Sequence, residues 1–192
     1  MVSVTGEAAD AELIAAVGQN EDAFALLYDR HAAQLYRYAY PRVGREAAED
    51  VVADTFLAAF RSIDRYDTTR PDARAWLFGI ATNVLARHRR TERARYRALA
   101  KSSGSEQVEL EFAELVDSHV SAVAASRTLA KSLARLAARD RDVLLLVAWA
   151  ELTYEQVSQT LNIPVGTVRS RLNRARRKMR EMLKSNDVEV SL

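Results

Sequence analysis

The sequence contains no cysteine, only three histidines, three prolines and six glycines in 192 residues. Without cysteine the chain cannot form a disulfide, a thiolate zinc site or a cysteine nucleophile. The three histidines, His31, His88 and His119, lie far apart in the sequence, which argues against a histidine-based metal or catalytic centre. We therefore expect no metal and no cofactor.

Long apolar runs are also absent. The longest, such as Val143 to Ala150, are much shorter than the roughly 20 apolar residues that a membrane-spanning helix needs. The chain start lacks the basic and then apolar pattern of a secretory leader. With 48% hydrophobic and 28% charged residues, the composition is typical of a globular protein. We expect a cytoplasmic protein that does not contact a membrane.

Charge is segregated along the chain, although the formal net charge is only +2. Acidic residues dominate residues 1–30 and 101–119, whereas arginine and lysine dominate residues 87–97 and 169–184. Clustered basic side chains attract polyanions, and acidic segments avoid them. The pattern indicates two phosphate-contacting surfaces separated by an acidic spacer, although each run alone is equally consistent with a solvated helix face.

The scarcity of proline, glycine and alternating β-branched residues predicts an all-α fold. Three helices are expected in a first domain, with breaks at Pro41–Gly44 and Asp67–Asp72. A polar, acidic linker beginning near Lys101 follows, with a short helix at about Leu110–Val116. The expected helices cover residues 23–40, 46–63 and 73–95, and then 127–138, 140–150, 153–161 and about 166–183.

A helix-turn-helix is the most specific local pattern. Thr153 and Gln156 have the spacing of a capping box, in which each side chain satisfies an amide at the helix start. Asn162 tolerates the left-handed backbone of a tight turn, and Pro164 suits the first turn of the next helix. This combination predicts a helix-turn-helix, in which the two helices on either side of the turn pack together.

Helical projection divides this last helix into two faces. The apolar stripe, which we expect to be buried, consists of Val168, Leu172, Ala175, Met179 and Leu183. The opposite face carries side chains that can hydrogen-bond bases or phosphates, namely Thr167, Arg169, Ser170, Arg171, Asn173, Arg174 and Arg177. We interpret it as a DNA-reading face; the alternative is a solvated face of an ordinary bundle.

Projection of residues 46–63 predicts a partner-docking patch. The expected inward stripe is Val52, Phe56, Ala59, Phe60 and Ile63. On the outward face, Leu57 is surrounded by charges from Asp50, Asp54 and Arg61, so that apolar burial and charge register could act together. An isolated surface leucine is also ordinary, so the pattern alone is weak.

The third helix has a polar and basic face suited to DNA, including unstacked bases. That face carries Asn83, Arg87 and Arg90, with Thr82 and Trp76 at its edges. A purely structural Trp76 in the core is the alternative, and His88 is expected to be structural.

Three stretches in this order, Ala48–Phe56 (AEDVVADTF), Ala75–Asn83 (AWLFGIATN) and Leu161–Leu172, resemble bacterial sigma factors of the extracytoplasmic-function (ECF) group of the sigma-70 family. The resemblance implies two small helical domains, a sigma region 2-like bundle in residues 1–97 and a sigma region 4-like helix-turn-helix in residues 126–192. The acidic linker between them spans residues 98–125. It also implies a non-enzymatic subunit that binds core RNA polymerase and promoter DNA and, in regulated members, an anti-sigma protein.

Motif matching assigns expected roles to individual residues. Glu49, Asp50, Asp54, Leu57 and Arg61 would bind the polymerase clamp. Asp67, Thr68, Thr69, Arg70, Trp76, Asn83, Arg87 and Arg90 would contact the minus-ten element, where the loop before the third helix captures a flipped base. Thr167–Arg177 would read the minus-thirty-five element. Ala53 and Arg87 depart from the family pattern, which commonly has Gln and Asp there.

Two other classes of function remain open from sequence. One is an ordinary helix-turn-helix regulator with a sensor or dimerisation domain in residues 1–97, which would bind its operator tightly without polymerase. The other is an enzyme acting on nucleic acid, although the sequence has no clustered carboxylates in a metal-binding arrangement, no glycine-rich phosphate loop and no nucleophile motif.

Overall fold

The computed structural model describes residues 8–101 and 122–189. These residues form nine α-helices and one short 3-10 helix, η1, with no strand among them, so the predicted all-α class is confirmed. The elements are α1 (Asp10–Ala16), α2 (Glu21–Val43), α3 (Arg45–Arg61), η1 (Ile63–Arg65), α4 (Arg74–Arg87), α5 (Arg89–Lys101), α7 (Ala122–Arg135), α8 (Ala138–Ala148), α9 (Tyr154–Leu161) and α10 (Val165–Glu189).

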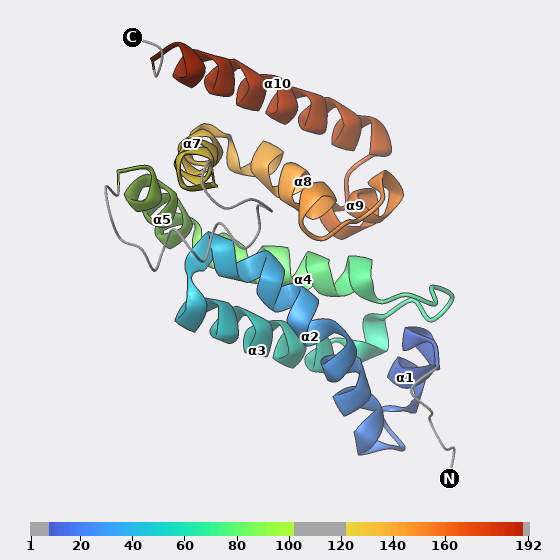
Figure 1. Cartoon of the computed structure of the whole chain (residues 1–192). Helices are drawn as coiled ribbons and strands as arrows, with labels where there is room; N and C mark the ends of the chain where they lie inside the picture. The colour runs from blue at the N-terminus through green and yellow to red at the C-terminus, as the bar shows by residue number, and fades with distance from the viewer. Residues whose placement is uncertain (1–7, 102–121, 190–192) are drawn as a thin grey trace.

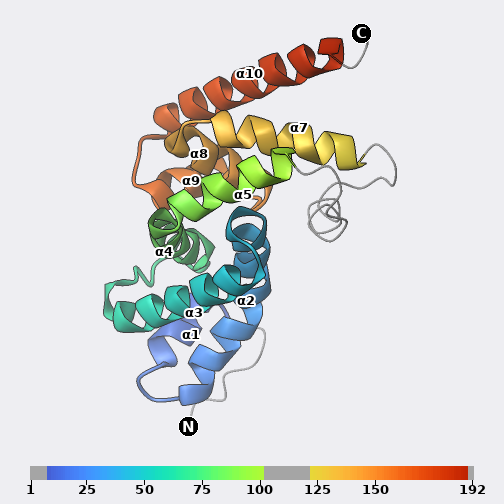
Figure 2. The same cartoon turned by 90° about the vertical axis from the view of Figure 1, so that its left-hand side faces the viewer.

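The helices are arranged in two halves (Figure 1). The first half consists of α1 to α5, and the second half consists of α7 to α10. Turning the molecule by 90° shows α5 lying beside α7, where the two halves meet (Figure 2). Apolar side chains from both halves, such as Leu77 of α4 and Leu146 of α8, belong to one continuous buried cluster. The two helical units therefore share a core.

Helix α2 continues through Pro41 and ends at Val43, three residues later than predicted. Proline in the last turn removes one amide donor but does not interrupt the remaining helical bonds. The helix ends because Gly44 adopts φ = 94°, a left-handed backbone conformation that residues other than glycine rarely adopt. Gly44 then begins the tight connection to α3.

The single helix expected over residues 73–95 is two helices. Helix α4 ends at Arg87 and α5 begins at Arg89, with His88 at the break. Helix α5 then extends to Lys101, four residues into the predicted linker, and α7 begins at Ala122. The short helix expected at 110–116 lies outside the described residues. Helix α1 was not predicted.

Asp10 of α1 ties together three distant parts of the first half. Its buried carboxylate accepts hydrogen bonds from Arg30 Nη1 (2.5 Å) and from the backbone amide of Ala73 (2.9 Å), and it lies 2.8 Å from His31 Nε2. Burial by itself raises the pKa of Asp10, but the bonds from His31 and the Ala73 amide outweigh it and lower the pKa to about 2. The carboxylate thereby fixes the start of α4 relative to α1 and α2.

The depressed pKa gives Asp10 a defined effect on stability. Because its folded-state pKa is about 2 against 3.8 unfolded, its contribution is fully present above pH 4 and is lost as the pH falls towards 2. We expect Asp10→Asn to lower the free energy of unfolding at neutral pH by about 2 kcal/mol. Urea unfolding at neutral pH and near pH 3 measures this, with Glu12→Gln on the exposed side of α1 as control. An unchanged stability at neutral pH would contradict the assignment.

Candidate nucleic-acid interfaces

The loop between η1 and α4 is held by its own side chains. Asp67 accepts hydrogen bonds from the Thr69 amide (3.2 Å) and hydroxyl (2.6 Å), and these bonds lower the pKa of Asp67. Arg70 Nε lies 3.1 Å from the same carboxylate, and the Tyr66 hydroxyl donates to the Arg70 carbonyl at 2.6 Å. The loop side chains Asp67, Thr68, Thr69 and Arg70 are all exposed. The loop therefore presents polar groups from an ordered backbone.

The polar face that was predicted for residues 73–95 is solvent-accessible. Asn83 and Arg87 of α4 are exposed, and so is Arg90, which belongs to α5 after the break. Trp76 is partly buried, with its ring centroid 5.0 Å from that of Tyr66. Trp76 thus packs against the core and against Tyr66 while part of its side chain stays exposed, and its contact with a base remains a prediction.

The expected docking face of α3 is also exposed. Leu57 is 47% exposed, and the charged residues predicted around it are at the surface: Glu49, Asp50, Asp54 and Arg61. Val52, Phe56 and Ala59 on the opposite side are buried, as predicted. Ala53, one of the departures from the family pattern, is exposed beside Asp54.

The prediction that Phe60 faces the core is wrong, because its side chain is 53% exposed. Phe60 lies in the last turn of α3, and its ring packs edge-on against Phe24 of α2 at 5.2 Å. Tyr28, 44% exposed, packs against Phe56 at 4.7 Å. Tyr28, Leu57 and Phe60 are thus exposed large apolar side chains of α2 and α3, of which sequence projection had found only Leu57.

The helix-turn-helix has the predicted local geometry. The Gln156 side chain accepts from the Thr153 amide at 2.9 Å, and the Thr153 hydroxyl accepts from the Gln156 amide at 3.2 Å, which completes the capping box. Asn162 is left-handed at φ = 49° and ψ = 53°. The stripe of α10 is buried at Val168, Leu172, Ala175 and Met179, but Leu183 is 37% exposed.

The predicted DNA-reading residues on the other face of α10 differ in their exposure and in whether they bond to other groups of the chain. Arg169 and Asn173 are exposed, and Arg171 is partly exposed; none of the three bonds to another side chain in the described residues. The Ser170 hydroxyl donates to the Thr167 carbonyl at 3.0 Å, and Arg177 lies 3.8 Å from Glu181.

Arg174 is held within the second half. Its guanidinium donates two hydrogen bonds of 2.7 Å to Asp140 of α8, whose carboxylate is almost fully buried. Hydrogen bonding to Arg174 lowers the pKa of Asp140. Arg174 therefore fixes the rotation of α10 on α8, a role that sequence projection could not reveal because Asp140 lies 34 residues earlier.

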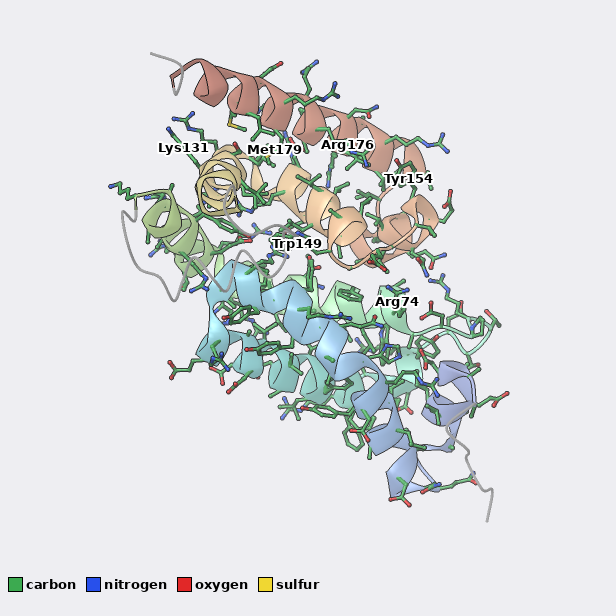
Figure 3. The ribbon with its side chains drawn as sticks, viewed as in Figure 1. Arg74, Lys131, Trp149, Tyr154, Arg176 and Met179 are labelled. Carbon is green, nitrogen blue, oxygen red and sulfur yellow. The ribbon has the colours of Figure 1, made fainter. Side chains whose placement is uncertain are left out.

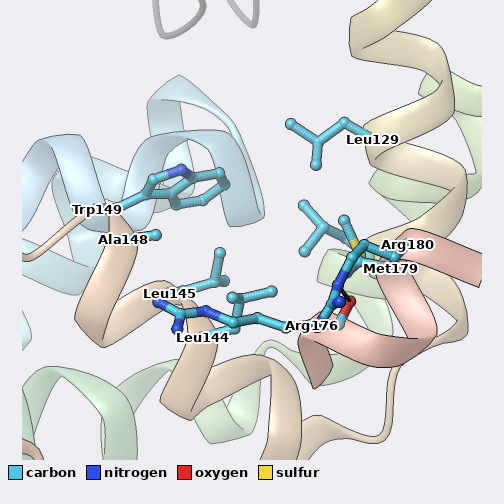
Figure 4. Close-up of a pocket in the computed structure, with 9 residues that line it drawn as sticks. Leu129, Leu144, Leu145, Ala148, Trp149, Arg176, Met179 and Arg180 are labelled. Atoms are coloured by element: carbon cyan, nitrogen blue, oxygen red, sulfur yellow. Dashed lines mark hydrogen bonds between the residues drawn. The ribbon is translucent and has the colours of Figure 1, made fainter. Parts of the chain in front are cut away.

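An apolar pocket of about 450 Å³ lies between α7, α8 and α10 (Figure 4). Its walls include Leu129, Leu144 and Met179, and Trp149 closes one side. Arg176 and Arg180 of α10 border the opening; Figure 3 shows Arg176 on the side of α10 that faces α8.

No helix in the described ranges is long and apolar enough to cross a membrane. Within the same ranges, no three His, Asp or Glu side chains are grouped so as to hold a metal ion.

Comparison with known proteins matches both halves. Sigma-70 region 2 matches residues 27–95, and Sigma-70 region 4 matches residues 126–179. The ECF RNA polymerase sigma factor SigW of Bacillus subtilis is 30% identical over 172 residues, covering 86% of this chain and 91% of SigW. SigL of Mycobacterium tuberculosis is 38% identical over 159 residues, covering 80% and 85%. The structure of CnrH in complex with the cytosolic domain of CnrY superposes with a TM-score of 0.69 at 30% identity, covering 92% and 97%.

The chain therefore belongs to the sigma-70 family of RNA polymerase sigma factors, of which it carries regions 2 and 4. Within this family it is an ECF sigma factor, which directs promoter-specific transcription initiation. Sigma factors are non-enzymatic subunits, so the alternative of a nucleic-acid enzyme is set aside. Because they act as subunits of RNA polymerase, the alternative of an independent regulator is set aside as well.

Arg174 and Arg169, both on α10, should differ in how much their truncation lowers the stability of the fold. Arg174→Ala leaves the buried Asp140 carboxylate without its bidentate partner, and we expect the free energy of unfolding to fall by about 2 kcal/mol. Arg169→Ala removes an exposed side chain, so the thermal unfolding midpoint should stay within error of wild type. Calorimetry of the two variants measures this. Equal destabilisation by both, or by neither, would contradict the assigned roles.

Proposed function

We propose that three surfaces of this chain have separate binding roles in transcription initiation. The α3 face around Leu57, extended by Tyr28 and Phe60, docks on the clamp of core RNA polymerase. The loop at residues 67–73 and the polar face of α4 and α5 hold the minus-ten element and a flipped base. The exposed face of α10 reads the minus-thirty-five element in the major groove.

The observation that carries this proposal is the helix-turn-helix with its capping box and exposed arginines. Arg169 and Arg171 are available to guanine edges or phosphates, because no carboxylate in the described residues pairs with them. Arg174 fixes the direction in which they point through its bond to Asp140. A rigid helix that presents unpaired cations and amides is what base readout requires.

In the first half, exposed side chains and an ordered loop support the two other roles, polymerase docking and minus-ten binding. The ordered loop presents hydroxyl and carboxylate groups from Asp67, Thr68 and Thr69, and Asn83 and Arg87 extend the polar surface along α4. Arg87, where the family commonly has Asp, adds positive charge towards the phosphates. Holding an unstacked base costs a few kcal/mol, which such polar contacts must offset.

Residues 1–97 and 126–192 would then be the two promoter-binding domains, with residues 98–125 as the acidic connector. The protein would act in the cytoplasm together with the polymerase. CnrH is known in complex with the cytosolic domain of CnrY. By analogy we propose an anti-sigma partner for this chain, for which the apolar pocket bordered by Arg176 and Arg180 is a candidate contact.

Run-off transcription with core polymerase on a library of upstream regions tests this proposal directly. We expect discrete start sites that require the chain, and a shared pair of upstream elements. A mobility shift with and without core polymerase is the companion measurement, and tight specific binding by the chain alone would contradict the proposal.

The docking patch makes a quantitative prediction. Leu57→Ala removes the apolar centre of the exposed α3 face, and we expect the affinity for core polymerase to fall about tenfold, because truncation of a central interface residue commonly costs 1 kcal/mol or more. Leu183→Ala, which truncates an exposed leucine of α10, is the matched control and should leave the affinity unchanged. Equal losses in both variants would place the docking surface elsewhere.

A further inference from the structure

The apolar pocket between α7, α8 and α10 lies entirely within the second half of the molecule. Leu129 and Leu133 of α7 line it on one side, Leu144 of α8 on another, and Met179 of α10 on a third. Figure 4 shows Trp149, at the end of α8, across this space from Leu129. The three helices thus leave an apolar space that their own side chains do not fill.

The pocket is much larger than the gaps that close packing leaves in a protein. Its volume is about 450 Å³, whereas interior voids rarely exceed the size of a water molecule. Leu133 at its base is buried, and Leu129 and Leu144 are partly exposed. Apolar walls cannot replace the hydrogen bonds of water, so an apolar group that displaces water from the pocket gains free energy.

Two cations border the opening of this pocket. Arg176 and Arg180 are one turn apart on α10, and both are exposed. Arg180 Nε lies 3.4 Å from the Arg176 carbonyl oxygen, and neither guanidinium pairs with a carboxylate in the described part of the chain. Among the described residues, no Asp or Glu lines the pocket. A guanidinium presents a fork of donors that matches a carboxylate, so the opening favours an anion.

An apolar interior with a cationic opening fits a ligand that has an alkyl chain and a carboxylate. Small-molecule sites typically combine an apolar lining with a few polar groups that orient the ligand. At roughly 30 Å³ per non-hydrogen atom, the share of one water molecule in the liquid, the pocket holds about fifteen such atoms. A twelve-carbon fatty acid has fourteen. A leucine side chain of a partner helix has only four, so it would fill a small part of the space.

We propose that this pocket is a binding site for a fatty acid of about twelve carbons. Its alkyl chain lies among Leu129, Leu144 and Met179, and its carboxylate lies at Arg176 and Arg180. Binding does not depend on the function proposed above. The proposed anti-sigma contact uses the same pocket, so a bound fatty acid and that partner would exclude each other; this consequence alone rests on the proposed function.

Titration calorimetry of the full-length protein with sodium dodecanoate, below the concentration at which micelles form, tests the proposal. We expect saturable binding of one molecule per chain. Decanoate, which is two methylenes shorter, should bind about tenfold more weakly. Dodecyltrimethylammonium, with the same chain and the opposite charge, should also bind at least about tenfold more weakly. Absence of saturable dodecanoate binding, or equal affinity for the cationic amphiphile, would overturn the site.

A variant that fills the pocket tests its location. Ala148 lines the pocket from an exposed position, so the ring of Ala148→Phe can enter the space without disturbing the buried core. Ala33→Phe, at an exposed position on α2, is the matched control. We expect Ala148→Phe to abolish dodecanoate binding and Ala33→Phe to leave it unchanged. Circular dichroism checks that both fold, and unchanged binding by a folded Ala148→Phe variant would place the ligand elsewhere.

The cationic opening is tested by removing one charge at a time. Arg176→Gln and Arg180→Gln should each lower the affinity for dodecanoate about fivefold, because each removes a charged donor to the carboxylate. Lys178→Gln removes an exposed charge of the same helix that does not line the pocket, and it should have no effect. An equal loss in all three variants would show attraction by net charge instead of a site, and would overturn the proposal.

Tryptophan fluorescence reports the ligand's position independently. The chain has two tryptophans, Trp76 and Trp149, and only Trp149 lines the pocket. Dodecanoate with a bromine near its methyl end should quench the fluorescence of wild type and of Trp76→Phe, but not that of Trp149→Phe. Quenching that persists in Trp149→Phe would contradict the assigned position.

Sedimentation velocity examines the alternative occupant, a second copy of the chain. We expect a monomer whose sedimentation Ala148→Phe does not change. A dimer that Ala148→Phe disrupts would assign the pocket to the second copy and overturn the proposal. Run-off transcription tests the proposed function separately, so the failure of that function and the failure of this site are distinguishable.

Discussion

The arrangement of this molecule depends on four buried charges that two halves of one chain share. Arg42 and Glu92 come from the first half, and Arg141 and Asp142 come from the second. Buried charges are tolerated only when they are paired, and each guanidinium has a carboxylate partner across the boundary: Arg42 bonds to Asp142, and Arg141 bonds to Glu92. The directional bonds set how α2, α5 and α8 face one another, and the surrounding apolar residues then pack as one core.

The contacts between the two halves are partly polar, and this affects how strongly the halves are held together. An interface made only of apolar side chains would be costly to separate, because it would expose hydrophobic surface to water. Charges and hydrogen-bonding groups regain water when they separate, so these polar contacts fix the geometry of the boundary while adding little net stability to the apolar core around them. The structure combines a close backbone contact at Gly79 with such polar bonds.

Much of the local structure was predictable from sequence because its determinants are close together in the chain. The capping box joins Thr153 to Gln156, and Asn162 supplies the left-handed turn, so the helix-turn-helix followed from short-range rules. The exposure of Asp54 and Leu57 followed from helical periodicity in the same way.

The remaining features depend on contacts between residues far apart in sequence, which periodicity cannot reveal. Arg174 looked available for DNA but pairs with Asp140, and Arg42 bonds Asp142 one hundred residues away. Phe60 satisfied the apolar stripe of α3, yet the bundle ends before it and leaves the ring at the surface against Phe24. Asp10 belonged to an acidic segment with no assigned role, and it anchors the start of α4.

If the two halves bind separate promoter elements, the packed halves of this structure must move apart when the chain binds core polymerase. Spin labels on cysteines introduced at Asp29 of α2 and Lys178 of α10, both exposed positions in a chain without native cysteine, allow the distance between the halves to be measured by pulsed electron paramagnetic resonance. The account predicts one short distance population for the free protein and a longer one when it is bound to core polymerase. The same distance distribution in both states would contradict it.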